Sequence, residues 1–441
     1  MGARAAAQSW PQGRGGMMRR LGGLMGPAQG LFAAVEGNAR VLVITEGVSA
    51  IAFHWYTTYL PLYMVALGVS EVQVGLLASV LIATQFISTL LGGYAADRFG
   101  RKRMLVVADI VCWGAPMLLY AVAQNPWYFL IGRLINGFVY IVMPSFECLF
   151  VEDVPTERRP AVFGMLRFVY AAANLFVPVA GLLVASLGMV VAGRVIMATT
   201  MVVAVATAIY RQFTLHETQM GQERMAAMAG ASPVAAARDY LIAARAIVAD
   251  RPTATFLGVR VLFGFVMTIW NTYAVIYLTD ALGVGLPKAA VSILPFVSAA
   301  ATMVMIVLAA NRIRLGSPAA NLVIGQLLWL AAALCFVASP AGTMVLALLW
   351  ALMAAVSSAF FQPASQSYWA NVVDERKRAQ IYSAASAAIA LGALPAGPLA
   401  GALYAANPRA PFVLGIGVQV VVFGLILSLR KRSGWSETQC H

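Results

Sequence analysis

Several ionisable side chains lie inside long apolar stretches of this sequence. They are Glu46, His54, Asp109, Arg133, Glu147, Arg167 and Arg260. Because a charged group is costly in hydrocarbon, such side chains are usually paired with one another or bind ions, protons or substrates. Carboxylates and histidine suit proton carriage, and arginines suit the binding of anions. The chemistry that these residues offer is therefore ion and solute binding inside a membrane.

Glu46 is the first candidate for a proton carrier. It lies in the apolar stretch 41–66, where burial favours the neutral acid and a nearby cation would favour the carboxylate. A carboxylate balanced between these two effects can take up and release a proton. Glu147 is the second candidate, and Arg167 and Arg260 are possible partners. The alternative is a permanently ionised structural pair.

The composition indicates an integral membrane protein. Of the 441 residues, 61% are hydrophobic and 11% are charged, whereas about 25% of the residues in soluble domains are charged. The mean hydropathy is +0.81. Each crossing needs about 20 mostly apolar residues, so the chain has room for about twelve crossings. No stretch is left for a separate soluble catalytic domain.

The net charge of +13 does not indicate a nucleic-acid partner, because the basic residues gather in alternate loops. The positive-inside rule assigns such loops to the cytoplasm, so both termini are expected there. Three of the four cysteines lie in apolar stretches, and the three histidines lack metal-ligand spacing. We therefore expect no disulfide framework, no metal site and no cofactor. The sequence also lacks H-E-x-x-H, G-x-S-x-G and phosphate-loop motifs, which disfavours an enzyme.

The most specific motif lies between two apolar stretches and reads Gly93-x-x-x-Asp97-Arg98-x-Gly100-Arg101-Lys102. The first glycine lets two helices approach closely, and the second permits the chain to reverse. The cations suit the cytoplasmic end of a membrane span. This spacing resembles the loop between helices 2 and 3 of the major facilitator superfamily of transporters, G-x-x-x-D-R-x-G-R-[RK], and the copy is complete.

The resemblance implies an all-α integral membrane protein with 12 transmembrane helices in two six-helix bundles. An internal repeat supports this fold: the segment 157–161, ERRPA, is matched by 375–379, ERKRA. In the same way Pro178-x-x-Gly181 is matched by Pro398-x-x-Gly401. Parallel duplication of a six-helix unit is typical of this architecture.

Apolar windows divide the chain into the expected helices. They cover 41–66, 72–95, 104–123, 127–150, 161–186, 189–210, 253–279, 288–310, 319–338, 342–366, 380–404 and 410–430. The resulting division is a cytoplasmic N-terminal segment 1–39, an N-terminal bundle 40–211, a cytoplasmic linker 212–251, a C-terminal bundle 252–432 and a cytoplasmic tail 433–441. Within the linker, the alanine-rich stretch 232–249 predicts a helix that lies on the membrane surface.

The resemblance also implies a cytoplasmic gate built from Gly93, Asp97, Arg98, Gly100, Arg101, Lys102, Glu152 and Asp153. Asp97 is expected near the start of helix 11, where a negative charge meets the positive end of the helix. Arg98 and Arg101 are expected to reach Glu152 and Asp153 at the end of helix 4. These contacts would hold the cytoplasmic side shut in the outward-facing state of alternating access.

The segment 133–137, RLING, resembles the helix 4 motif R-x-x-x-G of proton-coupled members, in which the arginine is implicated in coupling. Arg133 therefore joins Glu46 and Glu147 as a proton-coupling candidate, unless it reaches out to the membrane interface. Asp109 is expected to pair with the basic residues 101–103. The substrate-cavity candidates are His54, Arg133, Tyr140, Arg260, Trp270, Asn271, Phe361, Gln362 and Gln366. For the histidine and the aromatic residues, plain packing is the alternative.

Together these patterns predict a secondary active transporter of a small molecule, monomeric in the bacterial inner membrane. We expect proton-coupled efflux of amphipathic compounds, as in 12-helix drug/proton antiporters. The segment 174–181, NLFVPVAG, keeps only the proline and one glycine of the antiporter signature G-x-x-x-G-x-x-x-G-P-x-x-G-G. Symport or uniport uptake of a small organic solute or anion is therefore the alternative. A membrane enzyme or a receptor without transport is more remote.

Overall fold

The computed structural model describes residues 35–155, 157–227, 250–312, 318–372 and 378–432. The expected tail 433–441, the alanine-rich stretch 232–249 and most of the N-terminal segment 1–39 lie outside the described residues.

The first four spans belong to one helical bundle. The first two spans are α2 (Gly37–Ala66) and α3 (Glu71–Phe99). The third span consists of α4 (Arg101–Ala108), the π-helical turn η1 (Asp109–Gly114) and α5 (Ala115–Ala121). The fourth consists of α6 (Pro126–Gly137), the 3₁₀ turn η2 (Phe138–Val142) and α7 (Met143–Val151). Two of these spans thus contain a turn of altered helical geometry near their middle. Such turns interrupt the regular ladder of hydrogen bonds and often mark functional positions.

The next two spans share one long helix. The fifth consists of α8 (Arg159–Ala173), the short 3₁₀ turn η3 (Asn174–Phe176) and the first part of α9 (Val177–Thr214), and the rest of α9 is the sixth. The two parts of α9 are separated at Gly188, whose φ of 74° lies in the left-handed region that favours glycine. One residue therefore reverses the chain where other spans use a loop.

The second bundle repeats this plan. Its spans are α12 (Arg251–Thr279), the 3₁₀ turn η4 (Lys288–Ser292) with α13 (Ile293–Arg312), α14 (Pro318–Val337), α15 (Val345–Val372), α16 (Arg378–Ala393) with α17 (Ala396–Ala406), and α18 (Ala410–Arg432). A short helix, α10 (Gln219–Ala227), lies in the segment between the bundles. Asp250 caps α12 by accepting a hydrogen bond of 3.0 Å from the Thr253 amide, so this bundle begins at a defined residue.

Ten segments of the described chain are long and apolar enough to cross a membrane. One of them, 161–214, has 54 residues and contains the break at Gly188, so it holds two crossings. The 30-residue helix α2 is not among the ten, although its length is sufficient for a crossing of about 30 Å. With α2 and both parts of α9, the described helices agree with the expected twelve.

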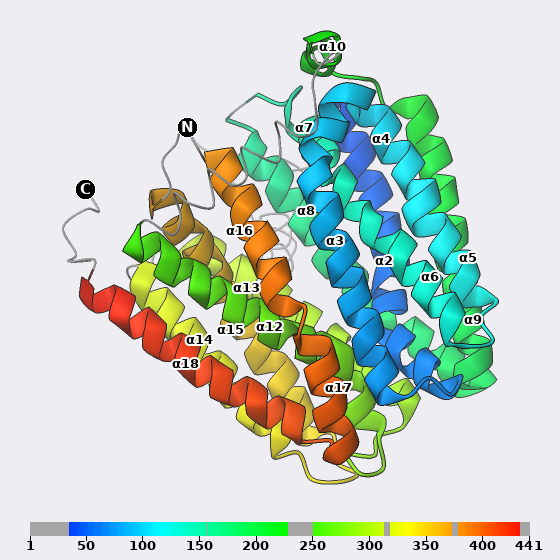
Figure 1. Ribbon diagram of the computed structural model, residues 1–441, viewed down its shortest axis with the longest axis vertical. Helices are drawn as coiled ribbons and strands as arrows, with labels where there is room; N and C mark the ends of the chain where they lie inside the picture. Colours follow the sequence, from blue (N-terminus) through cyan, green and yellow to red (C-terminus); the bar gives the residue numbers. More distant parts are fainter. Residues whose placement is uncertain (1–34, 156, 228–249, 313–317, 373–377, 433–441) are drawn as a thin grey trace, which may run out of the picture.

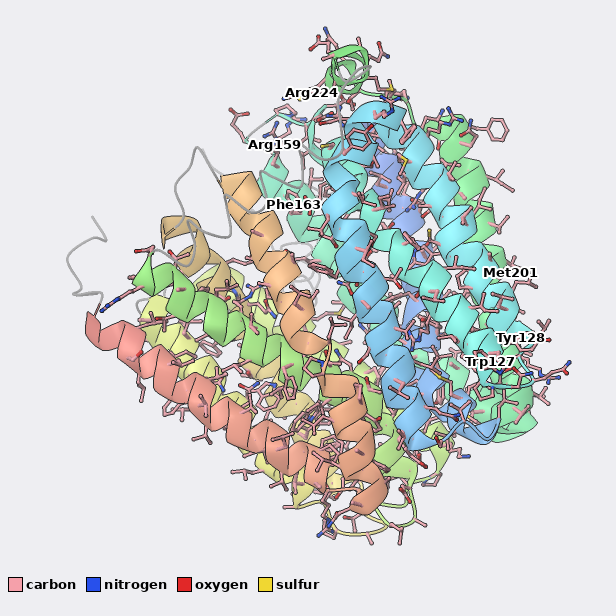
Figure 2. The ribbon with its side chains drawn as sticks, viewed as in Figure 1. Trp127, Tyr128, Arg159, Phe163, Met201 and Arg224 are labelled. Atoms are coloured by element: carbon pink, nitrogen blue, oxygen red, sulfur yellow. The ribbon has the colours of Figure 1, made fainter. Side chains whose placement is uncertain are left out.

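Figure 1 shows the two bundles side by side, meeting at one end and diverging toward the other. The end where α3 begins and α17 ends is called the closed end here. The opposite end, which carries residues 97–103 and α10, is called the basic end. Trp127 and Tyr128 point outward toward the closed end, and Arg159 and Arg224 lie at the basic end (Figure 2). Aromatic and basic side chains in such places are typical of the two water interfaces of a membrane.

Backbone contact between two glycines seals the closed end. A Cβ atom on Gly75 of α3 would collide with the carbonyl oxygen of Gly397 of α17, and a Cβ on Gly397 would collide with the carbonyl oxygen of Gly75. The Ser79 hydroxyl donates to the Leu394 carbonyl at 2.6 Å beside them. Small residues that allow such close approach are the usual means of helix association in membranes.

Candidate functional site

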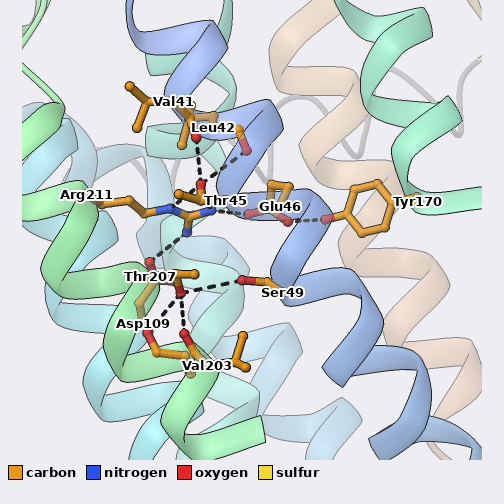
Figure 3. Close-up of polar contacts among 11 residues, drawn as sticks. Val41, Leu42, Thr45, Glu46, Ser49, Asp109, Tyr170, Val203, Thr207 and Arg211 are labelled. Carbon is orange, nitrogen blue, oxygen red and sulfur yellow. Dashed lines mark hydrogen bonds and ion pairs between the residues drawn. The ribbon is translucent and has the colours of Figure 1, made fainter. Parts of the chain in front are cut away.

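Three helices bring three charged side chains together inside the N-terminal bundle (Figure 3). Arg211 of α9 donates from Nη2 to Glu46 Oε1 of α2 at 2.6 Å and from Nη1 to Asp109 Oδ2 of η1 at 2.7 Å. The side chains of Arg211, Glu46 and Asp109 are 3%, 14% and 10% exposed. We call these three residues the charge cluster. Charged hydrogen bonds of this length, shielded from water, are strong.

Neutral hydroxyl groups complete the surroundings of the charge cluster. The Thr45 hydroxyl accepts from Arg211 Nε at 3.0 Å and from Nη2 at 2.8 Å, and it donates to the Val41 carbonyl at 2.9 Å. On the other side, the Tyr170 hydroxyl of α8 donates to Glu46 Oε2 (Figure 3). All three guanidinium nitrogens of Arg211 are therefore satisfied, and each oxygen of Glu46 has a donor.

A cavity of about 340 Å³ adjoins the charge cluster. Glu46, Asp109, Arg211 and Tyr170 form its polar wall, and the rest is mainly apolar and aromatic, with Phe53, Trp113, Tyr140 and Phe146 among its lining residues. An apolar chamber with a few converging polar groups is the usual form of a small-ligand site.

Irregular helical turns shape this cavity. The π-helical turn η1 begins at Asp109 and contains Trp113, and the 3₁₀ turn η2 contains Tyr140, so part of the wall from the third and fourth spans comes from altered geometry. The Asn136 side chain donates to the Cys112 carbonyl at 2.8 Å. This bond stabilises the π-helical turn because it gives a partner to a carbonyl in the disturbed ladder.

The partners of the carboxylates differ from those expected from the sequence. Glu46 pairs with Arg211 and not with Arg167 or Arg260. Asp109 pairs with Arg211 and not with the basic residues 101–103. Eight residues, or about 12 Å of helical rise, separate Asp109 from Arg101, whereas α9 lies directly beside it.

Arg211 itself was not expected in the site, because it follows the apolar window 189–210 and was assigned there only as the last residue of the bundle. The helix continues to Thr214, which leaves the arginine inside the span and only 2% exposed. The sequence did contain a signal for Arg211: Thr207 and Arg211 are four residues apart, so a polar helix face runs from the apolar window to the arginine. In the structure this face lies near the cluster, where the Ser49 hydroxyl donates to Thr207 at 3.5 Å.

The motif at the basic end holds a second buried ion pair. Arg101 is 3% exposed, and its Nη1 lies 2.9 Å from Glu152 Oε2, as the sequence predicts. The same nitrogen donates to the Thr218 hydroxyl at 2.9 Å, and the Lys102 amide donates to Glu217 Oε2 at 3.0 Å. The motif is thus bound to the fourth span and to the segment that leads into α10. Gly100, with a φ of 85°, makes the turn between α3 and α4.

The remaining motif residues lie around this pair. Asp97 is 3.9 Å from Arg101, and the guanidinium of Arg98 lies 5.9 Å from the ring centre of Phe99. Asp153 accepts a bond of 3.2 Å from Asn38 instead of an arginine of the motif. Gly93 lies within α3. The expected neighbour of Asp97, the start of helix 11, corresponds to the first turn of α16, which directly follows residues 373–377, outside the described residues.

Replacing Thr218 by valine is expected to detach α10 from the motif. The hydroxyl binds Arg101, Glu152 and the Gly221 amide, and valine keeps its shape without these bonds. A loss of about 2 kcal/mol would raise tryptic cleavage at Arg224 about thirtyfold when opening is fast relative to cleavage. Thr214→Val is the control, since the hydroxyl of Thr214 donates to the carbonyl of Tyr210 in its own helix and has no contact with the motif among the described residues. Equal cleavage rates in the two variants would contradict the role of Thr218.

Arg133 and Glu147 do not contact the charge cluster in the described structure. Arg133 donates to the Tyr56 hydroxyl at 3.3 Å, and its buried Nε has no hydrogen-bond partner among the described residues. Glu147 is exposed. Of the expected coupling residues, Glu46 alone is part of the cluster.

The expected substrate-cavity residues lie in different places. Trp270 and Phe361 are each 4% exposed and belong to the core: the ring of Trp270 is 4.9 Å from that of Trp329, and Phe361 stacks on Phe263 at 5.0 Å. Plain packing, the alternative for the aromatic residues, describes both in this conformation, because the ring of Trp270 lies among other rings and that of Phe361 lies against Phe263. Tyr140 lines the cavity of the N-terminal bundle.

His54 has two hydrogen-bond partners within the first bundle. Its Nε2 lies 3.2 Å from the Tyr170 carbonyl and 3.1 Å from Asn174 Nδ2. Asn271 and Gln362 are exposed.

Two arginines meet neighbouring residues of α15. Arg167 of the first bundle donates to Gln366 Oε1 at 3.1 Å, and Arg260 of the second bundle donates to Ser365 Oγ at 3.2 Å. The first of these bonds crosses between the bundles. It places positive charge beside the bundle interface, in the halves of α8 and α15 nearer the basic end.

The family model described as Major Facilitator Superfamily matches residues 42–319 of this sequence. The chain belongs to the major facilitator superfamily. It is accordingly a multi-pass membrane transporter, and the complete motif of residues 93–102 and the two bundles agree with that membership.

Curated relatives of this superfamily member share limited segments with it. A Na(+), Li(+), K(+)/H(+) antiporter of Planococcus maritimus is 31% identical over 149 residues, 32% of this chain and 33% of the relative. Multidrug resistance protein MdtG of Escherichia fergusonii is 30% identical over 159 residues, 34% of this chain and 39% of the relative. The matches thus span between a third and two fifths of the length of these relatives.

Solved structures of similar fold cover nearly the whole chain. The nucleoside transporter NupG has a TM-score of 0.69 at 16% identity, over 90% of this chain and all of that one. A POT family transporter in complex with a thioalcohol-conjugated peptide has a TM-score of 0.70 at 13% identity, over 91% of this chain and 99% of that one. At such identities the likeness concerns the fold of this superfamily member.

Proposed function

We propose that this protein is a proton-coupled exporter of small amphipathic compounds in the bacterial inner membrane, with both termini in the cytoplasm. The observation that carries the proposal is the charge cluster, in which the carboxylate of Glu46 is buried beside an apolar cavity and held by a cation. Intramembrane carboxylates in such settings are the usual carriers of coupling protons. The printed names of two relatives, an alkali-cation/proton antiporter and a multidrug resistance protein, support the same direction.

The orientation follows from the distribution of charge. Residues 98–103, 158–159 and 211 lie toward the basic end, together with α10, so the positive-inside rule directs this end to the cytoplasm. The closed end then faces the periplasm. In this conformation the bundles are sealed on the periplasmic side and diverge on the cytoplasmic side (Figure 1), as an exporter requires for loading.

The mechanism consists of rocking the bundles about the substrate while Glu46 exchanges a proton. Arg133 and Glu147 remain further coupling candidates, and His54, Asn271, Gln362 and Gln366 remain candidates for substrate contact. The Arg101–Glu152 pair lies within the N-terminal bundle and is formed while the bundles diverge on the cytoplasmic side, so closure of that side would depend on contacts of the motif with the C-terminal bundle, such as that expected between Asp97 and the start of α16. The protein would need only its substrate, protons and the bilayer, and would act as a monomer.

The test is proton movement in sealed proteoliposomes on addition of lipophilic cations, neutral drugs, sugars or organic anions. For Glu46→Gln, substrate-driven proton flux is expected to fall at least about a hundredfold, because the amide cannot carry a proton. Glu223→Gln, a change of the same kind on the exposed face of α10, is expected to behave as the wild type. Full proton flux in Glu46→Gln would contradict the proposal, and loss in Glu147→Gln alone would move the coupling to the fourth span.

A second candidate function is uptake of a small organic anion. It is favoured by Arg167 and Arg260, which meet neighbouring residues of α15 beside the bundle interface. Two arginines at one place suit a carboxylate or phosphate. Saturable anion binding that is lost in both Arg167→Gln and Arg260→Gln, without proton release in the wild type, would favour this function over the first.

A further inference from the structure

We propose that Asp109 is a positioning residue that makes Glu46 able to exchange a proton, because it retains Arg211 when Glu46 becomes neutral. The inference rests on the proposed proton coupling and deepens it. It assigns a role to a carboxylate of the third span and to an arginine of the sixth.

The first step is the charge count. Two carboxylates face one guanidinium, so the charge cluster carries a formal charge of −1 when all three groups are ionised. The side chains are between 3% and 14% exposed, and a net charge in such surroundings is costly. One added proton makes the cluster neutral. The site is therefore suited to one proton and not to two.

The second step is the geometry of Arg211. Its Nη1 binds Asp109 and its Nη2 binds Glu46, so the two carboxylates occupy different nitrogens. Thr45 holds Nε and shares Nη2. When Glu46 takes up a proton, Arg211 keeps its counter-ion and two further hydrogen bonds. Without Asp109, the same proton would leave a buried guanidinium unpaired, which is strongly unfavourable.

The third step is the difference between the two acids. Glu46 also receives the Tyr170 hydroxyl, and Tyr170 is three residues from Arg167 on the same face of α8. Arg167 bonds Gln366 of the other bundle. Glu46 is thus linked through one helix to the bundle interface, whereas the contact of Asp109 described here is with Arg211. Glu46 is the acid placed to exchange the proton, and Asp109 the one placed to hold the cation.

The test compares Asp109→Asn with Glu46→Gln in proteoliposomes, in two transport modes. Substrate counterflow, which needs no net proton movement, is expected to be less affected in Asp109→Asn than gradient-driven accumulation, because a neutral Arg211–Glu46 pair remains. Accumulation driven by a pH gradient is expected to fall at least about tenfold, since Glu46 then stays ionised. Asp109→Glu, which restores the second carboxylate, is expected to recover gradient-driven accumulation.

A chemical probe reads the protonation of Glu46 without any substrate. A hydrophobic carbodiimide adds to a protonated carboxyl group and forms an acylurea, so the labelled fraction of Glu46, located by mass spectrometry, reports its neutral form. In Asp109→Asn this labelling is expected to fall at least about fivefold, and in Glu46→Gln the adduct at residue 46 is absent.

Two results would overturn the inference. One is wild-type labelling of Glu46 together with wild-type gradient-driven accumulation in Asp109→Asn. The other is a loss of counterflow in Asp109→Asn that Asp109→Glu does not repair, which would make Asp109 purely structural. Failure of the proposed function would give a different result, because the wild type itself would then show no proton flux with any substrate. The labelling of Glu46 by the carbodiimide, compared between the wild type and Asp109→Asn, would still report whether Asp109 affects the protonation of Glu46.

Discussion

The double variant Glu46→Gln/Asp109→Asn is expected to unfold at temperatures at which either single variant stays folded. Each single change leaves Arg211 with one carboxylate and a neutral pair, whereas the double change leaves a buried guanidinium without a counter-ion. Removing the partner of a buried charge costs about 3–5 kcal/mol. The measurement is the fraction of monodisperse protein that survives heating in detergent, followed by size-exclusion chromatography.

A triple variant provides the control for this result. Adding Arg211→Met to the double variant removes the stranded charge and keeps a long apolar side chain in its place. Apolar replacement of a whole buried ion cluster is often neutral or stabilising, so thermal survival is expected to return. If the losses in the two single variants simply add up to that of the double variant, the three groups are independent and the cluster is not a unit.

Gly75→Ala is expected to slow transport about ten- to a hundredfold. The new Cβ would overlap the carbonyl oxygen of Gly397 and the hydroxyl of Tyr273, and the backbone carbonyl cannot rotate away. Overpacking of this kind costs about 1–3 kcal/mol, and here it would destabilise the conformation in which α3 and α17 touch. The measurement is the substrate flux in proteoliposomes, with the labelling rate of Ser79→Cys by an impermeant maleimide as a reporter of opening.

The matched control is Gly424→Ala in α18, where an added Cβ has no neighbouring atom within 4 Å. Its flux and labelling are expected to equal those of the wild type. A Gly75→Ala protein with unchanged flux would show that transport does not depend on this close approach of α3 and α17.

The fold was accessible from the sequence because it depends on strong and repeated signals. The motif of residues 93–102, the repeated segments 157–161 and 375–379 and the length of the apolar windows all predict the same two bundles. The structure adds where the helices change geometry. The π-helical turn η1 is followed by Pro116, which has no N–H to donate to the carbonyl four residues earlier, Cys112, and Asn136 from another span donates to that carbonyl instead.

The site was less accessible, since it depends on helix ends and on contacts between distant segments. Glu46 was identified because a carboxylate in an apolar stretch is rare. Arg211 was not, because it stands at the edge of a window, and one further turn of helix decides whether it lies in water or in the bundle. Trp270 illustrates the plain-packing alternative, since a large aromatic residue on a helix expected to line the cavity can face the core of its own bundle.

The turn at Gly188 gives the fifth and sixth spans the form of a hairpin with a single hinge. One arm carries Tyr170 and the other carries Arg211, and both side chains hold Glu46, which lies between them. The bonds of Glu46 to Tyr170 and to Arg211 therefore join the two arms across the open side of the hairpin. On the proposed proton coupling, we expect loss of negative charge at Glu46 to weaken both of its bonds to the arms. Because the arm that carries Tyr170 also carries Arg167, which bonds Gln366, a change of charge at Glu46 would then reach the neighbouring bundle through this hairpin.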